Sequence, residues 1–235
     1  MPLGSGALAG LPYDLDREFV AEQLGFTSIS LNSMDAVSDR DFLLDFQSAT
    51  SICMMHLSRL SEELIIWSSD EFGFVRISEE YTTSSSIMPQ KHNPDFAELA
   101  RGKTCRVFGN LISLLTMLKG LPMTYNRDLQ EDKEGFFDSY DTLSETLEVF
   151  SGMLPNLVID SERMLSAAKD SYLLATDLAD YLVAKGLSFR DAYINVSELT
   201  NYALNKNKFL HELKLEDFKR LSTPVSYTHL TMPTS

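Results

Sequence analysis

The sequence predicts an all-α protein, and three features of the chain indicate this fold class. Residues 39–68 contain neither glycine nor proline, and their apolar side chains recur at the three- and four-residue spacing of a helix. Two further long stretches, residues 94–118 and 129–153, carry few breaks. Only residues 72–77, where apolar positions alternate, favour a short strand. Three long helices predict an elongated bundle in which each helix packs along most of its length.

Capping residues and helix breakers justify the elements in chain order. Asp14, Ser38 and Asn93 are the N-caps expected for the first three helices. Pro94 suits the first turn of the third, because it has no amide hydrogen to pair. Shorter helices, each with a plausible Ser or Thr N-cap, follow Pro155. The predicted ranges are 14–25, 39–68, 94–118, 129–153, 161–169, 176–185 and 188–205.

The change in helix length predicts the domain organisation. Residues 1–165 are expected to form the long-helix bundle, and residues 166–221 a small C-terminal helical domain. Residues 222–235 contain two prolines and many Ser and Thr residues, and the stretch V-S-Y-T-H-L-T resembles translated adapter sequence. This tail is therefore expected to be unstructured or artefactual, with a natural flexible tail as the alternative.

Composition narrows the classes of partner. The chain carries 34 acidic and 20 basic residues, a net charge of −14, which argues against nucleic acid or an anionic membrane as partner. Cys53 and Cys105 lie in apolar helical surroundings, so a reducing cytoplasm is expected rather than a disulfide framework. The four histidines form no metal-binding motif, and we expect neither metal nor cofactor. No apolar run is long enough for a membrane span.

The most informative segment is Ser85-Ser86-Ile87-Met88-Pro89-Gln90-Lys91-His92-Asn93-Pro94. It places hydroxyl groups, an ammonium group and the start of a helix within ten residues. The free N–H groups and positive dipole at a helix start attract carboxylate or phosphate, and Lys91 adds a full charge. The segment therefore indicates an anion site. The alternative is a Ser/Thr-rich linker before a capped helix.

The pattern S-S-x-M-P-x-K-x-N resembles the shared motif of the fumarase, aspartase and argininosuccinate lyase superfamily. Three other segments are similar to the argininosuccinate lyase family in particular, and the similarity extends from about Pro2 to Leu221. These segments are G-S-G-A-L-A-G at 4–10, N-S-M-D-A-V-S-D-R-D at 32–41 and Y-N-R-D-L-Q-E-D-K-E at 125–134.

The resemblance implies reversible cleavage of argininosuccinate to arginine and fumarate by a homotetramer in which each site draws on three subunits. It also assigns roles to seven residues. The catalytic positions are Ser85, Lys91 and Glu98, of which Glu98 is expected to orient a histidine. The substrate-binding positions are Asn93, Tyr125, Gln130 and Lys133.

The reaction removes a proton from a carbon beside a carboxylate, so both the base and the resulting dianion need stabilisation. Serine is a poor base at neutral pH, and Ser85 can act only if nearby cations or N–H donors favour its alkoxide. Which proton Ser85 transfers stays open. Ordinary alternatives exist for the other positions: a solvated Lys91, a dipole partner for Glu98, and a solvated acidic turn around Asp128, Glu131 and Asp132.

The chain departs from the family at several points. Ser84 replaces the usual Gly before the serine pair, and His92 replaces the more usual Lys. Family members are roughly twice this length, and their first part supplies histidine-bearing and Ser-Arg-Asn-bearing segments of the site. We therefore expect a C-terminal part of such an enzyme, with no appreciable fumarate release on its own. The alternatives are a structural, crystallin-like homologue and another fumarate-releasing enzyme such as adenylosuccinate lyase.

Overall fold

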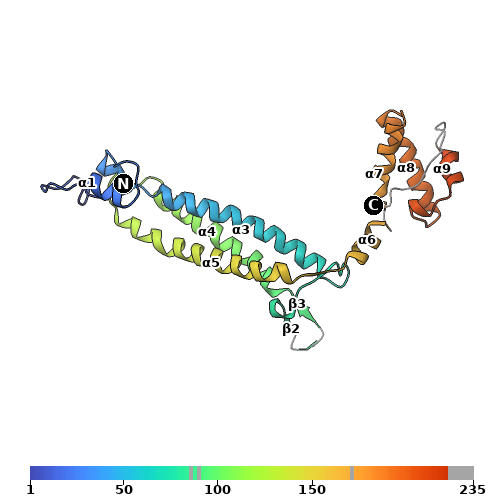
Figure 1. The fold of residues 1–235 in the computed structure, drawn as a ribbon, viewed down its shortest axis with the longest axis horizontal. Coiled ribbons are helices and arrows are strands. Elements are labelled where there is room, and N and C mark those ends of the chain that lie inside the picture. Colours follow the sequence, from blue (N-terminus) through green and yellow to red (C-terminus); the bar gives the residue numbers. More distant parts are fainter. Residues whose placement is uncertain (85–86, 89–90, 170–171, 222–235) are drawn as a thin grey trace. The chain divides into compact units, whose positions relative to one another are not determined.

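A computed structural model describes residues 1–84, 87–88, 91–169 and 172–221 of the chain (Figure 1). Helices make up most of these residues, and the strands among them are two residues long, which confirms the predicted all-α class. The chain divides into two compact units between Ile159 and Asp160. The domain limit predicted at 165/166 falls within the first helix of the second unit.

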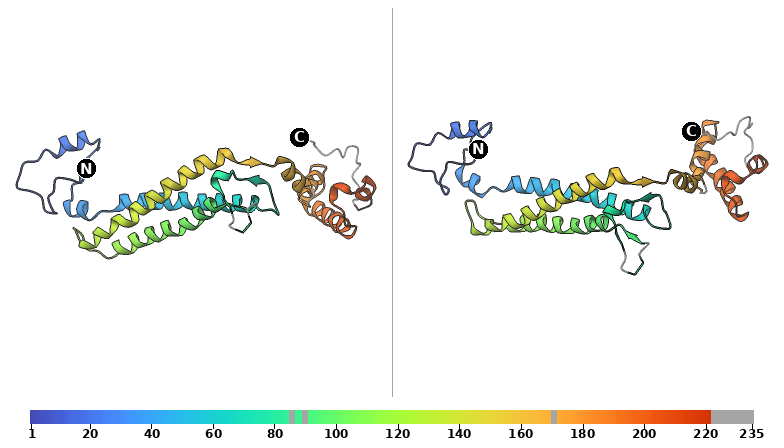
Figure 2. Two further views of the ribbon diagram at one scale, coloured as in Figure 1. Left: turned by 90° about the horizontal axis from the view of Figure 1, so that it is seen from below. Right: turned by 60° about the horizontal axis from the view of Figure 1, so that its bottom comes forward.

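The first unit contains the long-helix bundle (Figures 1 and 2). Its elements are α1 (Arg17–Gln23), α2 (Ser33–Ser38), α3 (Asp41–Trp67), β1 (Val75–Arg76), η1 (Glu79–Tyr81), β2 (Thr83–Ser84), β3 (His92–Asn93), α4 (Asp95–Leu118), η2 (Arg127–Glu131), α5 (Asp132–Met153), η3 (Leu154–Asn156) and β4 (Val158–Ile159).

Helices α3, α4 and α5 pack side by side, and small polar side chains fill much of the contact between them. Thr104 Oγ1 of α4 donates a hydrogen bond to the Met54 carbonyl of α3 at 3.2 Å. Asn110 Nδ2 donates to Asp138 Oδ2 at 2.8 Å and to Ser139 Oγ at 3.0 Å, which joins α4 to α5. Such paired polar groups keep buried hydroxyls and amides satisfied.

A hydrophobic cluster lies at the end of the bundle where α4 begins. Its buried members come from α3, α4, α5 and the β1 segment, and Tyr81, Trp67 and other half-buried side chains pack against it. The buried members are Leu64, Val75, Ile77, Ala100, Phe150 and Met153. Strand β1 pairs antiparallel with β4, so the predicted strand within residues 72–77 is confirmed for Val75 and Arg76.

The second unit contains four helices among its described residues: α6 (Ser161–Lys169), α7 (Leu174–Ala184), α8 (Phe189–Asn205) and α9 (Leu215–Leu221), with a 3-10 turn, η4 (Leu210–Glu212). Buried Leu182, Val196 and Leu199 form its core. Ser188 caps α8 as predicted, because its Oγ accepts from the Asp191 amide at 3.1 Å.

Several predicted helix starts are wrong by a few residues. The long helix begins at Asp41 and not at 39, because Asn32 caps a separate helix, α2, that ends at Ser38. Residue 93 is not an N-cap: α4 begins at Asp95 with Pro94 at the cap position, while Asn93 pairs in β3. The third long helix begins at Asp132, after the 3-10 turn η2.

Some features lie beyond the sequence prediction. The β2–β3 pair was not predicted, because residues 82–84 show neither helical nor strand periodicity. Helix α9 was not predicted either. Across the residues that the structure describes, no helix combines the length and apolarity of a membrane span.

Candidate functional site

The predicted site residues fall into two groups at opposite ends of α4. Lys91, Asn93 and Glu98 lie where α4 begins, whereas Tyr125 and Lys133 lie beyond its end (Figure 1). Helix α4 has 24 residues and spans about 36 Å at 1.5 Å per residue. One chain therefore does not bring the two groups together.

The first group lies on and beside a short antiparallel strand pair, here called the arm and defined by the described residues 82–84, 87–88 and 91–94. Strands β2 and β3 pair antiparallel, with Thr83 opposite Asn93 and Ser84 opposite His92. Thr83 Oγ1 also donates a hydrogen bond to the Asp95 carboxylate at the start of α4. Ser85, the predicted catalytic residue, lies outside the described residues; its neighbour Ser84 belongs to β2.

The described residues of the arm present their polar groups to solvent. Lys91 and His92 are exposed and Asn93 is half-buried. Glu98 is exposed in the first turn of α4, and its amide donates to the Pro94 carbonyl at 3.0 Å. Glu98 thus lies in the turn where the positive end of the helix dipole favours a carboxylate, as the dipole interpretation expects. Its orienting role stays a prediction.

The second group follows the end of α4, in a tight turn before η2. Thr124 has a φ of 86°, in the left-handed region that non-glycine residues rarely adopt. Asn126 Nδ2 donates to the Pro122 carbonyl at 3.0 Å and to the Thr124 carbonyl at 3.5 Å, which holds this backbone in place. Tyr125, between them, is 48% exposed, and Gln130 is exposed in η2. Both are accessible to a ligand.

Asp132 links this turn to the α2–α3 junction. Its Oδ2 accepts from Arg40 Nε at 2.6 Å, and its Oδ1 accepts from Lys133 Nζ at 2.8 Å. Burial raises the pKa of Asp132, but the hydrogen bonds from Lys133 and Arg40 outweigh it, so this pKa lies below the ordinary aspartate value. The side chain of Asp132 is only 4% exposed, so the interpretation of this residue as part of a solvated acidic turn is wrong.

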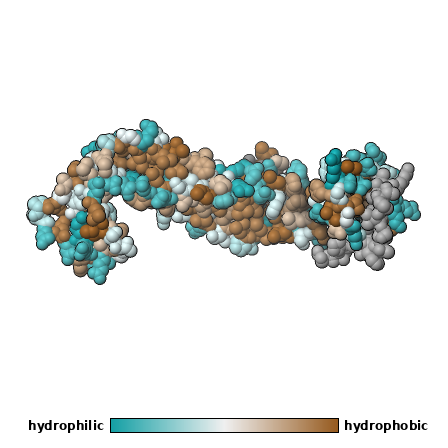
Figure 3. Space-filling view, turned by 90° about the horizontal axis from the view of Figure 1, so that it is seen from above, coloured by the Kyte–Doolittle hydropathy of each residue, from teal (hydrophilic) through white to brown (hydrophobic). Residues whose placement is uncertain are grey.

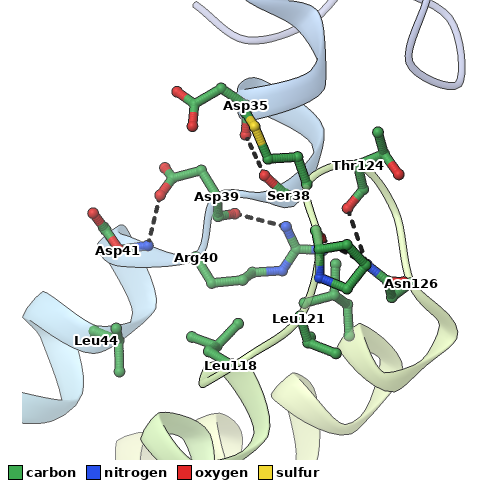
Figure 4. A pocket seen from close by; sticks show the side chains of 13 residues that line it. Asp35, Ser38, Asp39, Arg40, Asp41, Leu44, Leu118, Leu121, Thr124 and Asn126 are labelled. Carbon is green, nitrogen blue, oxygen red and sulfur yellow. Dashed lines mark hydrogen bonds between the residues drawn. The ribbon is translucent and has the colours of Figure 1, made fainter.

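A pocket of about 290 Å³ lies beside this cluster. The α2–α3 junction, the end of α4 and the turn before η2 form its walls. Figure 4 shows Arg40 reaching from the start of α3 toward the Leu121–Asn126 loop. The guanidinium donates to the Val37 carbonyl at 3.2 Å and to the Asp39 carbonyl at 2.6 Å. Arg40 therefore holds the junction while it orients Asp132.

Sequence reasoning missed Arg40 and Asp132 as partners. They are 92 positions apart, and neither local periodicity nor spacing connects them. Within the described residues, no group of three or more His, Cys, Asp or Glu side chains is arranged to hold a metal ion.

We expect Asp132→Asn to destabilise the chain in a pH-dependent way. The substitution leaves Arg40 without its carboxylate and should lower the free energy of unfolding by about 3 kcal/mol at pH 6. Since the folded pKa of Asp132 lies below the unfolded value of 3.8, its contribution is present above that pH and is lost as the pH falls through the folded pKa.

Urea unfolding followed by circular dichroism at several pH values measures this effect. The gap between the parent chain and Asp132→Asn should shrink below about pH 3.8. Glu131→Gln is the matched control, because Glu131 is the exposed neighbour of Asp132. A gap that stays constant across the whole pH range would contradict the ion-pair assignment.

Comparison with known proteins places the chain in a family. A family model described as "Lyase" matches residues 1–109, and one described as "Argininosuccinate lyase C-terminal" matches residues 172–232. Argininosuccinate lyase of Dehalococcoides mccartyi is 60% identical over 222 residues, which cover 94% of this chain and 48% of that protein. The chain belongs to the argininosuccinate lyase family. It spans about half the length of the curated relatives that it matches.

Other argininosuccinate lyases match at similar levels. The protein of Symbiobacterium thermophilum is 57% identical over 221 residues, covering 94% of this chain and 48% of that protein. The protein of Syntrophotalea carbinolica is 52% identical over 238 residues, covering 100% and 52%. The predicted family is confirmed, and these relatives do not favour the crystallin-like or adenylosuccinate lyase alternatives.

Solved structures of other lyases share the fold of this chain. EDDS lyase in complex with formate has a TM-score of 0.84 and 29% identity, over 94% of this chain and 44% of that chain. A class II fumarase from Schistosoma mansoni has a TM-score of 0.74 and 18% identity, over 94% and 51%, and supports the fold alone.

Proposed function

We propose that the protein to which this chain belongs catalyses the reversible elimination of fumarate from argininosuccinate to give arginine. The observation that carries this proposal is the identity of 52–60% to curated argininosuccinate lyases across nearly the whole chain. A variant of EDDS lyase with bound fumarate, at 28% identity, adds support for fumarate as the released product.

The residues of the arm supply the chemistry in this proposal. Ser85 transfers a proton, and its alkoxide needs cationic and N–H neighbours. Lys91 supplies the cation, and the free N–H groups where α4 begins stabilise the dianion that forms on the substrate. Asn93 contacts a substrate carboxylate, and Glu98 orients a histidine.

The second group of residues binds the substrate in the same proposal. Tyr125, Gln130 and Lys133 contact argininosuccinate from the turn before α5. Because Asp132 holds the ammonium of Lys133 at 2.8 Å, that cation is placed before the substrate arrives. Pre-placed charge stabilises an anionic substrate without a further ordering cost.

The separation of the two groups supports a composite site. A substrate of the size of argininosuccinate cannot reach across the length of α4, so each site takes its arm and its Tyr125 turn from different chains. We therefore propose an assembly of several copies of the chain, and the family resemblance implies a homotetramer. Apolar side chains left exposed along the bundle are suited to such contacts (Figure 3). They include Ile52, Leu99, Phe108, Ile112, Leu115, Phe137 and Leu147.

We also propose a cytoplasmic location. Cys53 and Cys105 are both free thiols, and Cys105 is exposed. Exposed thiols persist in a reducing compartment.

A chimaera tests the proposed function. Residues 1–221 would replace the aligned half of the Dehalococcoides mccartyi relative, and ultraviolet absorbance would follow fumarate release. We expect turnover of argininosuccinate with equimolar arginine, and none of adenylosuccinate. A folded chimaera that leaves argininosuccinate intact, or prefers adenylosuccinate, would contradict the proposal.

A further inference from the structure

Tyr81 and Gly152 make a contact that only glycine permits at position 152. Gly152 lies in the last turn of α5, and Tyr81 ends η1. A Cβ atom added to Gly152 would overlap the Tyr81 hydroxyl and lie 3.0 Å from Tyr81 Cζ. The tyrosine ring therefore rests directly on the backbone of α5, and a methyl group at position 152 must displace it.

The Tyr81 ring also packs against a residue that follows the arm. Tyr81 immediately precedes the arm, and Phe96 lies in the first turn of α4, which follows it. The two rings pack edge to face, with centroids 6.0 Å apart and an interplanar angle of 72°. Tyr81 packs against the buried cluster that contains Ile77 and Phe150 as well. Tyr81 thus joins both ends of the arm to α5.

The placement of Asn93 depends on the placement of Tyr81. Thr83 is two residues from Tyr81 and pairs with Asn93 across the hairpin. The hydrogen bond between Thr83 and Asp95 ties the same strand to α4. A displacement of Tyr81 would therefore move the strand pair that holds Asn93.

We propose that Tyr81, seated on Gly152, is a positioning residue that fixes the arm on the bundle. Tyr81 touches no reacting atom and acts through the arm that carries Asn93. The catalytic consequence rests on the proposed function, but the effect on the arm does not.

Hydrogen–deuterium exchange on the 235-residue chain tests the effect on the arm. We expect Gly152→Ala to speed exchange of the described arm amides about tenfold relative to those of α3. Tyr81→Phe alone should leave exchange near the parent value. The double variant should restore most of the slow exchange, because the overlap with the hydroxyl is gone and the remaining 3.0 Å approach to Cζ requires only a small shift of the ring.

Gly109→Ala is the matched control, since a Cβ at Gly109 in α4 meets nothing within 4 Å. Emission of Trp67, the single tryptophan, reports whether the same cluster stays packed. If Gly152→Ala does not fold, Tyr81→Leu tests the proposal instead, because it removes the ring contact without adding a Cβ atom to α5. This variant should also speed exchange of the arm amides. The proposal is overturned if neither variant speeds arm exchange, if Tyr81→Phe does not rescue Gly152→Ala, or if Gly109→Ala acts equally.

The chimaera supplies a second readout. Gly152→Ala should lower kcat per folded molecule by roughly 10- to 100-fold, as expected for a reacting group displaced by about 1 Å, and should raise KM as well, because Asn93 moves with the arm. The double variant should recover most of the loss. A lowered Tm with unchanged kcat per folded molecule would indicate a purely structural role and overturn the positioning role. If the unsubstituted chimaera is inactive, the proposed function fails, while the exchange result still decides how the arm is held.

Discussion

Ser85→Ala in the chimaera is expected to lower kcat by about 10²- to 10⁴-fold, with argininosuccinate affinity within about threefold of the parent value. The hydroxyl is proposed to transfer a proton, so its loss affects the transition state and leaves most substrate contacts in place. Steady-state fumarate release gives kcat, and calorimetry with argininosuccinate gives the dissociation constant.

Two neighbouring serines provide the controls for Ser85. Ser86→Ala should retain most of the activity. Ser84→Gly, which introduces the glycine usual in the family, should also retain most of the activity, because Ser84 is an exposed residue of β2 with no proposed role in the reaction. Unchanged kcat in Ser85→Ala would move the proton-transfer role to Ser84 or Ser86.

Mixing two inactive variants is expected to restore activity. Ser85→Ala removes the proton-transfer group of the arm, and Lys133→Met removes a substrate contact beyond the other end of α4. If each site combines an arm and a Tyr125 turn from different chains, about a quarter of the sites in randomly mixed tetramers contain both intact residues. Unfolding and refolding the chimaeric variants together, followed by the fumarate assay, should show this recovery.

The control for mixing uses two variants of the same arm. Ser85→Ala mixed with Lys91→Met should recover nothing, because every site receives its arm from one chain. Recovery in this control, or its absence in the first mixture, would contradict the composite site.

Local signals in the sequence predicted most helices. Helix α6 was predicted with its observed limits and the end of α4 at its observed residue, and Ser188 caps α8 as its residue type indicates. These features depend on neighbours within one turn of helix. The start of α3 was wrong because Ser38, the expected N-cap, is the last residue of α2, whereas Arg40 occupies the N-cap position of α3 without a side-chain cap hydrogen bond.

Partners that are distant in the chain were beyond the sequence prediction. The pairing of Thr83 with Asn93 depends on where α4 begins, and the arm shows no strand periodicity. The contact of Tyr81 with Gly152 joins residues that no spacing rule relates. Both depend on how the bundle packs.

By itself the sequence determined the helical class and the family, because helix periodicity, caps and the S-S-x-M-P-x-K-x-N motif are local patterns of residues. Only the tertiary structure decided that Asp132 is buried between Arg40 and Lys133, and that the arm and the Tyr125 turn lie a helix length apart. The physical reason is that burial and separation depend on contacts between distant segments. Because α4 is a rigid helix of 24 residues, the residues at its two ends cannot meet within one chain.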